Sequence, residues 1–183
     1  DVAPFVSVNH QGNSIQSHLI GHYNFQNLQA AIAIGNHFGV PSQDIKEAIE
    51  KYIPTNNRSQ ILQKGNATII LDAYNANPSS MEVALENFQK LEATYKTVVL
   101  GDMFELGTAS KAEHERIAET AIAFDFDEIH LIGEQFSKTK TSKAITYTTF
   151  EVFKNAFQPN KKGSFLIKGS RGMALERMLE LFD

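Results

Sequence analysis

The sequence predicts an α/β fold in which a mainly parallel sheet carries helices on both faces and follows a smaller unit. From Gln60 onward, short and almost continuously apolar stretches alternate with amphipathic stretches, as in sheets whose two faces are both covered. Before that point the chain shows a hairpin pattern, two helical stretches and then the polar segment IPTNNRSQ, where its character changes. We therefore expect two domains, residues 1–54 and 55–183.

The first domain is predicted to contain one hairpin and two helices. The stretches PFVSV and SIQSHLI alternate in polarity, and HQGN between them is typical of a hairpin turn. After Gly21 the apolar residues follow helical spacing, and Gly39 is the expected end of this helix. Pro41 and Ser42 then begin a second helix, PSQDIKEAIEKY.

The second domain is predicted to alternate strands and helices. We expect strands over 67–72, 96–101, 128–132, 144–148 and 164–168, and helices over 78–93, 110–124, 150–157 and 171–182. This order is that of a Rossmann-like fold, in which ligands bind beyond the carboxyl ends of the strands. The function should therefore lie in the loops DAYNANP, GDMFELG, IGEQF and KGSRG.

Composition and charge exclude several function classes. The chain has a net charge of -4 and dispersed lysines, which argues against nucleic acid as a partner. It has no cysteine, which excludes disulfides, thiolate zinc sites and a cysteine nucleophile. No apolar run approaches the roughly 20 residues that span a bilayer, and the first residues lack the layout of a signal peptide. We expect a cytoplasmic protein without membrane insertion.

The turn DAYNANP combines polar side chains with a proline at the end of an apolar strand. Asp72 is well placed to accept hydrogen bonds from ribose hydroxyls. It can equally cap a turn whose polarity comes from Asn75 and Asn77, since asparagine bonds to nearby backbone. Pro78 would then simply begin the next helix. From the residues alone, both interpretations stay open.

The loop KGSRG places two cations at the end of the last strand. Lys168 ends the strand, Ser170 is the expected N-cap, and Arg171 lies in the first helical turn, where its charge opposes the helix dipole. Cations beside free backbone N–H groups suit a carboxylate or a phosphate. The alternative is a solvated helix start whose long side chains reach into water.

The loop GDMFELG and the nearby histidines are less specific. Asp102 and Glu105 could hold a cation or an amine, or simply belong to a polar surface loop. His114 is expected either on a solvated helix face or bonded back into the preceding loop, and His130 is expected to be a packing residue. The chain has no GxxxxGK[ST], GxGxxG, HExxH or GxSxG motif, so any nucleotide site here is incomplete. We expect no metal ligands and no certain catalytic residue in this chain.

Five segments carry a resemblance to a known family. GHYNFQNLQAA, NNRSQ, LDAYNANPSSM, VVLGDMFELG and LIKGSRGMALE, in this order and spacing, resemble the second half of a Mur ligase. The resemblance covers essentially the whole chain: residues 1–54 match the C-terminal part of the central ATPase domain, and 55–183 match the C-terminal Rossmann-like domain. It implies a cytoplasmic ligase that uses ATP and Mg²⁺ in peptidoglycan precursor synthesis. DAYNANP, the most specific segment, implies that D-alanyl-D-alanine is added to UDP-N-acetylmuramoyl-tripeptide through an acyl phosphate.

The resemblance also implies roles for the nucleotide side of the site. Asn24 and Asn27 match paired asparagines near the adenine, Arg58 matches a linker arginine that reaches ATP, and Asp72 matches the acid that binds the ribose. Many members of the family have histidine where this chain has Tyr23, but the spacing of the two asparagines is kept.

On the acceptor side, the resemblance assigns one group of residues to the DAYNANP loop and another to the KGSRG loop. The first group faces the acceptor substrates and consists of Tyr74, Asn75 and Asn77. The second group helps to hold the carboxylate of the incoming dipeptide and consists of Lys168, Ser170 and Arg171. The phosphate-loop lysine and the acid and histidine that organise Mg²⁺ belong upstream in the family. The chain begins with Asp1 rather than methionine, so we expect a piece of a longer protein that is inactive without its other domains.

Two alternatives remain open at this point. The chain could belong to another Mur-type amide ligase with a different substrate. It could also be a Rossmann-like nucleotide-binding module without catalysis.

Overall fold

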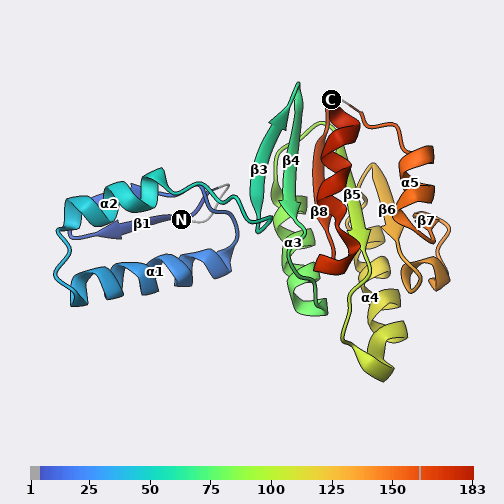
Figure 1. Ribbon diagram of the computed structural model, residues 1–183, viewed down its shortest axis with the longest axis horizontal. Coiled ribbons are helices and arrows are strands. Elements are labelled where there is room, and N and C mark those ends of the chain that lie inside the picture. Colours follow the sequence, from blue (N-terminus) through green and yellow to red (C-terminus); the bar gives the residue numbers. More distant parts are fainter. Residues whose placement is uncertain (1–4, 161) are drawn as a thin grey trace. The chain divides into compact units, whose positions relative to one another are not determined.

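The computed structural model describes residues 5–160 and 162–183, and for His22 it describes the backbone alone (Figure 1). The chain divides into two compact units, Asp1–Thr55 and Asn56–Asp183, with the division inside the polar stretch IPTNNRSQ. Each unit has its own apolar core, so each is described by itself.

The first unit is an antiparallel hairpin packed with two helices. Its elements are β1 (Ser7–His10), β2 (Asn13–Gln16), α1 (His22–His37) and α2 (Ser42–Lys51). Gln11 and Gly12, between the strands, have φ values of 49° and 80°, the two positive values that a type I′ hairpin turn needs. Gly39 follows α1 with a φ of 70°, which supports the predicted helix end. The core is formed by Val6, Val8, Ile15, Leu28, Ile32, Ile45 and Ile49.

The second unit is built on a six-stranded sheet with the order β3-β4-β8-β5-β6-β7. The strands are β3 (Gln60–Lys64), β4 (Ala67–Asp72), β5 (Lys96–Gly101), β6 (Glu128–Ile132), β7 (Ile145–Tyr147) and β8 (Ser164–Lys168). β3 pairs with β4 in antiparallel orientation, and all the other pairs are parallel. The chain thus returns from the far edge of the sheet to place β8 between β4 and β5.

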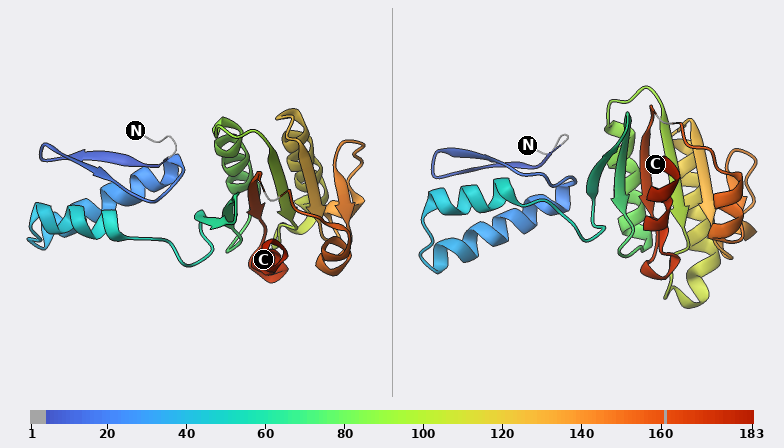
Figure 2. Two further views of the ribbon diagram at one scale, coloured as in Figure 1. Left: turned by 90° about the horizontal axis from the view of Figure 1, so that it is seen from above. Right: turned by 45° about the horizontal axis from the view of Figure 1, so that its top comes forward.

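Helices cover both faces of this sheet (Figure 2). On one face lie α3 (Pro78–Lys90) and α4 (Ser110–Ala123), and on the other lie α5 (Phe150–Ala156) and the C-terminal η4 (Leu175–Phe182). Short 3₁₀ turns complete the unit: η1 (Gly107–Ala109), η2 (Phe136–Lys138) and η3 (Arg171–Met173). The predicted α/β fold with a mainly parallel sheet and helices on both faces is confirmed.

The core beneath α5 and η4 is rich in aromatic rings. Phe153, Phe165 and Met178 are completely buried there, against the apolar residues of the central strands. The opposite face buries Met81, Leu85 and Ile117 of α3 and α4. Because both faces of β4, β5 and β8 are covered, these strands are apolar along nearly their whole length.

Two features of the second unit differ from the prediction. β3 was not predicted as a strand, because QILQK mixes polar and apolar residues, as an edge strand with partial exposure can. The C-terminal segment is not one continuous helix over 171–182. It forms two 3₁₀ segments separated by Ala174, whose φ of 48° interrupts the helical path.

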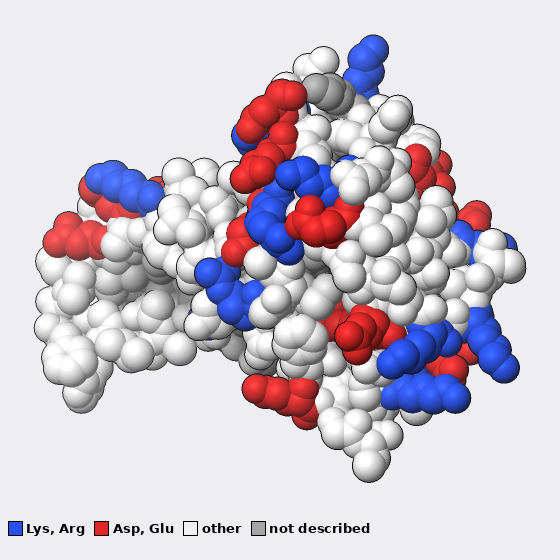
Figure 3. All heavy atoms as spheres, turned by 45° about the vertical axis from the view of Figure 1, so that its right-hand side comes forward, with Lys and Arg blue, Asp and Glu red and all other residues white. Residues whose placement is uncertain are grey.

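On the face drawn in Figure 3, acidic and basic side chains are intermixed, in keeping with the small net charge. Among the described residues, none of the helices is both long and apolar enough to cross a membrane.

Candidate functional site

Asp72 and Lys168 form a buried ion pair at the carboxyl edge of the sheet. β4 and β8 are parallel neighbours, and their register places these two residues side by side at the strand ends. Lys168 Nζ lies 2.5 Å from Asp72 Oδ2 and also donates to the backbone oxygen of Asn75 at 3.2 Å. The Lys168 side chain is only 2% exposed. Lys168 thus fixes both the carboxylate and the turn that follows it.

The residues just after the unit boundary are tied to the same corner. The backbone N–H of Ser59 donates to Asp72 Oδ1 at 3.0 Å. The guanidinium of Arg58 lies 3.9 Å from the centroid of the Tyr74 ring, within the range of a cation–π contact. The Tyr74 side chain remains 43% exposed. This corner therefore presents an open aromatic and cationic surface beside a fixed carboxylate.

The two asparagines of DAYNANP make local contacts. Asn77 is the N-cap of α3: its Oδ1 accepts from Ser80 N at 2.9 Å, and Ser80 Oγ accepts from Asn77 N at 3.1 Å. This reciprocal capping box, with Pro78 at the first helical position, defines where the helix begins. Asn75 Oδ1 accepts from the N–H of Ala76 at 2.9 Å. Turn and cap chemistry thus accounts for part of the polarity, as one of the two interpretations expected.

Asn24 and Asn27 are joined to each other in the first unit, near the start of α1. Asn24 is buried and its Nδ2 donates to the backbone oxygen of Ile20 at 2.7 Å. Its Oδ1 accepts from Asn27 Nδ2 at 3.0 Å, while the Asn27 side chain is exposed. The inner asparagine thereby orients the outer one. Of the predicted residues in the second unit, the structure brings together Arg58, Asp72, Tyr74, Asn75 and Lys168.

The other two predicted residues of the KGSRG loop point elsewhere. Ser170 occupies the N-cap position of η3, but its hydroxyl does not cap that segment. It accepts from the backbone N–H of Phe104 at 2.9 Å instead, so the predicted N-cap position is confirmed while the hydroxyl binds another loop. Arg171 pairs with Glu176 at 3.2 Å, and its side chain is 61% exposed. Arg171 is therefore a surface residue whose ion pair is with Glu176 rather than with the corner formed by Asp72.

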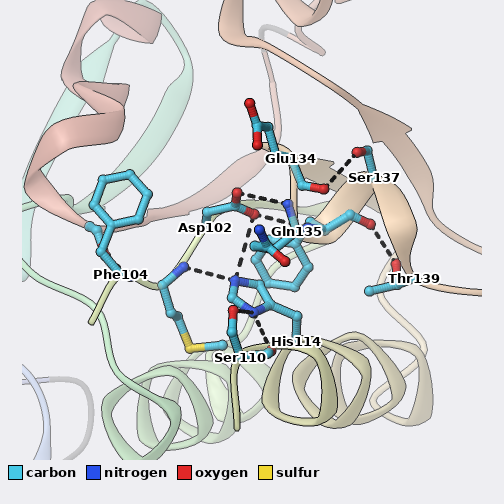
Figure 4. Close-up of polar contacts among 11 residues, drawn as sticks. Asp102, Phe104, Ser110, His114, Glu134, Gln135, Ser137 and Thr139 are labelled. Carbon is cyan, nitrogen blue, oxygen red and sulfur yellow. Dashed lines mark hydrogen bonds and ion pairs between the residues drawn. The ribbon is translucent and has the colours of Figure 1, made fainter. Parts of the chain in front are cut away.

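Asp102, in the loop after β5, is a buried carboxylate that organises the neighbouring loop (Figure 4). It is 4% exposed, and its two oxygens accept from the backbone N–H groups of Gln135 and Phe136, each at 2.9 Å. The surface-loop interpretation of Asp102 was therefore wrong. No group of three or more His, Asp or Glu side chains suited to a metal ion occurs within residues 5–160 and 162–183.

His114 holds the same loop from α4 and is completely buried. Its Nδ1 lies 2.7 Å from the carbonyl oxygen of Ser110, and its Nε2 lies 3.0 Å from the N–H of Met103. A carbonyl can only accept and an amide N–H can only donate, so Nδ1 donates to Ser110 and Nε2 accepts from Met103. The expectation of a bond back to the loop is confirmed, and the solvated alternative was wrong.

Three consecutive backbone N–H groups of this loop are thus held by different elements. Asp102 N donates to the oxygen of Ile132, Met103 N to His114, and Phe104 N to Ser170. The sequence contained these residues but no signal that joined them, because the partners lie up to 66 positions apart. These three hydrogen bonds fix the backbone of the segment, while the side chain of Phe104 remains 46% exposed.

A cleft of about 590 Å³ opens beside this loop. Its walls come from the segments that follow β5, β6, β7 and β8, namely residues 102–107, 133–135, 148–150 and 172–173, and from Ser110 of α4 and Arg177 of η4. Such a volume falls in the range of small-molecule sites, and this edge of the sheet is where α/β folds bind ligands. Three of these four loops were predicted from the sequence, but Arg177 was not.

The fold is that of a doubly wound α/β domain, a class of domain that binds ligands beyond the carboxyl ends of its strands. A family model described as "Mur ligase, glutamate ligase domain" matches residues 57–164, more than half of the chain. The chain belongs to the Mur ligase family.

Relatives with a known activity cover nearly the whole chain. It is 33% identical over 179 residues to the UDP-N-acetylmuramoyl-tripeptide–D-alanyl-D-alanine ligase of Treponema pallidum, covering 92% of this chain and 39% of that protein. The ligase of the same name from Bacillus subtilis is 30% identical, with 88% of this chain and 38% of that protein covered. The chain thus spans about two fifths of the length of the relatives it matches.

Solved structures show the same similarity. A crystal structure of MurF from Acinetobacter baumannii superposes with a TM-score of 0.82 at 29% identity, covering 93% of this chain and 40% of that one. The MurF ligase from Thermotoga maritima, solved in complex with ADP, gives 0.78 at 21% identity, with 97% and 44% covered. The latter similarity concerns the fold alone.

Proposed function

We propose that this chain is the C-terminal part of an ATP-dependent ligase that joins D-alanyl-D-alanine to UDP-N-acetylmuramoyl-tripeptide. The reaction proceeds through an acyl phosphate in cytoplasmic peptidoglycan precursor synthesis. In this proposal the first unit is the end of the central ATPase domain, and the second unit is the C-terminal domain. The observation that carries it is identity of 30 to 33% over about nine tenths of the chain to ligases of this activity.

On the nucleotide side, ATP supplies the phosphoryl group that activates the substrate carboxylate. Asp72 is the proposed ribose ligand, because its carboxylate is fixed at a strand end and its side chain stays 16% exposed. Arg58, held against Tyr74, is the proposed contact to ATP from the segment that joins the two units. Asn24 and Asn27 are proposed to lie near the adenine, with the outer amide oriented by the inner one.

On the acceptor side, the residues of DAYNANP are proposed to position substrate rather than to react with it. Tyr74 has the exposed ring, and Asn75 and Asn77 shape the turn on which that ring sits. Lys168 is buried and paired, so it acts on the substrates through Asp72 and Asn75. Excluding water from an activated carboxylate is the physical need that closure of the other domains over this edge would meet.

The proposal assigns the magnesium ligands to the upstream part of the ligase. The described residues offer no cluster of acidic or histidine side chains that fits a divalent cation. The roles derived for this chain are therefore binding, orientation and exclusion of water, and none of them passes through the metal.

The test measures turnover by the full-length protein that contains this chain. Phosphate release would be measured with UDP-N-acetylmuramoyl-tripeptide, ATP and Mg²⁺, with D-alanyl-D-alanine or single amino acids as the amine. We expect release only with the dipeptide, and a product whose mass is that of the pentapeptide. Release with a single amino acid instead would identify a different Mur-type ligase, and no release with any amine would favour a binding module.

A further inference from the structure

We propose that the cleft between the loops after β5, β6, β7 and β8 holds the incoming dipeptide, with its carboxylate on Arg177. This inference rests on the proposed function and locates its amine substrate. The cleft is separate from the Asp72 corner, because neither Asp72 nor Lys168 lines it. The ligand class is a small zwitterion with a carboxylate, an amine and small apolar groups.

Arg177 supplies the cationic end of the site. It is the only Lys or Arg among the described residues that line the cleft. Its Nε donates to the oxygen of Ala174 at 3.0 Å, and its two Nη atoms donate to Glu151 and to the oxygen of Met173. These contacts use three of the five N–H groups of the guanidinium, so two remain for a carboxylate.

The orientation of Arg177 is fixed before any ligand arrives. Its guanidinium lies 4.2 Å from the centroid of the Phe150 ring, which also lines the cleft. A cation held by a ring and two backbone oxygens loses little freedom on binding. By contrast, Lys168 is buried against Asp72 and Arg171 pairs with Glu176 outside the cleft, so neither offers a comparable site within it.

Two acidic side chains also line the cleft. Glu105 and Glu134 both line the cleft, and neither carboxylate has a hydrogen bond or ion pair with another described residue. Figure 4 shows the Glu134 carboxylate pointing away from the contacts around Asp102. Unpaired carboxylates beside a cleft suit the amine end of a dipeptide, while Arg177 takes the opposite end.

Apolar side chains also line the cleft and suit the two methyl groups of the dipeptide. They include Phe104, Phe150 and Met173. Phe104 rests against Gly172 so closely that a Cβ at Gly172 would lie 2.6 Å from the ring. The backbone of Phe104 is held by Ser170, and the adjacent Met103 by His114. Ser170 is thereby a positioning residue for the cleft, through Phe104.

The experiment compares two matched arginines in the full-length ligase. Arg177→Gln removes the proposed carboxylate contact, and Arg116→Gln serves as the control. The side chains of Arg177 and Arg116 are 45% and 43% exposed and both pair with glutamate, but Arg116 lies on α4 outside the cleft. We expect Arg177→Gln to raise KM for D-alanyl-D-alanine by about tenfold or more, as for a lost hydrogen bond to a charged group. KM for ATP should stay unchanged in both variants.

A second variant guards against misfolding of η4. Glu134→Gln removes a charge that has no partner to lose, and it should also raise KM for the dipeptide while leaving KM for ATP unchanged. Titration with D-alanyl-D-alanine amide, which lacks the carboxylate, should show the same weak binding to wild type and to Arg177→Gln.

The outcomes separate the two proposals. If wild type turns over the dipeptide and neither Arg177→Gln nor Glu134→Gln changes its KM, the cleft assignment is wrong and the proposed function stands. A rise in KM with Arg171→Gln but not with Arg177→Gln would move the carboxylate to the KGSRG loop and overturn the inference. If wild type does not turn over the dipeptide at all, the proposed function itself fails.

Discussion

Two polar networks on the same sheet differ in what their side chains hold. At the carboxyl edge, the side chains of Asp72, Asp102 and His114 mostly hold backbone groups of loops. The second network begins at the opposite edge, with Tyr95 and Glu128, and there the partners are other side chains. The first arrangement fixes the loops and leaves neighbouring exposed side chains free to contact a ligand. In the second arrangement the side chains satisfy one another's hydrogen bonds.

In the side-chain network, successive hydrogen bonds are donated toward the carboxylate of Glu128. Tyr95 donates to Glu128 at 2.7 Å, and His130 Nε2 lies 3.1 Å from the other oxygen of the same carboxylate. Because a carboxylate accepts, His130 donates from Nε2, and its Nδ1 accepts from the hydroxyl of Tyr147 at 3.1 Å. The ring of Phe157 packs edge-on against His130. The hydrogen bonds are thus all donated toward Glu128, and an aromatic ring packs over His130. This arrangement is typical of a network that stabilises the fold.

The presence of buried ionisable side chains therefore does not by itself indicate a binding site. Both networks contain a buried histidine and a carboxylate. The carboxyl-edge network also adjoins a cleft, because Asp102 and Met103 line it. Function is therefore predicted by what surrounds a polar network rather than by the network alone.

The largest expected effect comes from breaking the ion pair at the carboxyl edge. Asp72→Ala leaves the Lys168 ammonium buried without its partner, which typically costs about 3 to 5 kcal/mol. Denaturant unfolding should show this loss of stability in the midpoint. Adding Lys168→Met to the same variant should recover most of it, since the unpaired charge is removed. An Asp72→Ala chain as stable as wild type would contradict the pairing.

A somewhat smaller loss is expected at the second anchor of the same edge. His114→Ala leaves the N–H of Met103 and the oxygen of Ser110 without partners and removes a ring packed on Phe136. We expect a loss of about 2 to 3 kcal/mol and faster hydrogen exchange at Met103 and Phe104. His130→Ala is the matched comparison: it should destabilise the chain without speeding exchange in that loop. Equal exchange in both variants would contradict the loop-anchoring role.

Fold and site differ in how far the sequence predicts them. The parallel strands are predicted because burial on both faces makes them apolar along their length. β3 is not, because it is a partly exposed edge strand. The turn DAYNANP is identifiable because its polar residues follow one another, whereas the contact of Ser170 with Phe104 depends on tertiary packing of two loops. Turns and helix caps, which depend on neighbouring residues, can be predicted from the sequence, whereas hydrogen bonds between distant loops cannot.

The side-chain network predicts that the stability of the chain depends on pH through His130. Burial lowers the pKa of His130 below its ordinary value, although Glu128 partly offsets this. Below pH 6.5 the unfolded chain takes up a proton that the folded chain resists, so stability should fall on acidification toward the depressed pKa. His130→Phe should flatten this slope in unfolding measured from pH 7.5 to 5. An unchanged slope would assign the acid sensitivity to other groups.

The same network should respond at the alkaline end. The hydrogen bond to Glu128 raises the pKa of Tyr95 to about 12. Above pH 10 the unfolded chain loses the tyrosine proton first, so the stability that this bond contributes is present below pH 10 and is lost as the pH rises toward 12. Tyr95→Phe should remove that part of the alkaline decline, measured by unfolding between pH 9 and 11. A Tyr95→Phe chain with the wild-type decline would contradict the assignment.

The smallest effect separates capping from substrate contact at Asn77. Its side chain accepts from Ser80 N, so Asn77→Ala should cost about 1 kcal/mol through the lost N-cap. Asn77→Asp keeps the cap and places a favourable charge at the start of α3, so it should restore stability. If Asn77 only caps, both variants of the full-length protein keep the wild-type KM for UDP-N-acetylmuramoyl-tripeptide in the proposed reaction. If its amide nitrogen also contacts substrate, Asn77→Asp combines wild-type stability with a raised KM, which capping alone cannot produce.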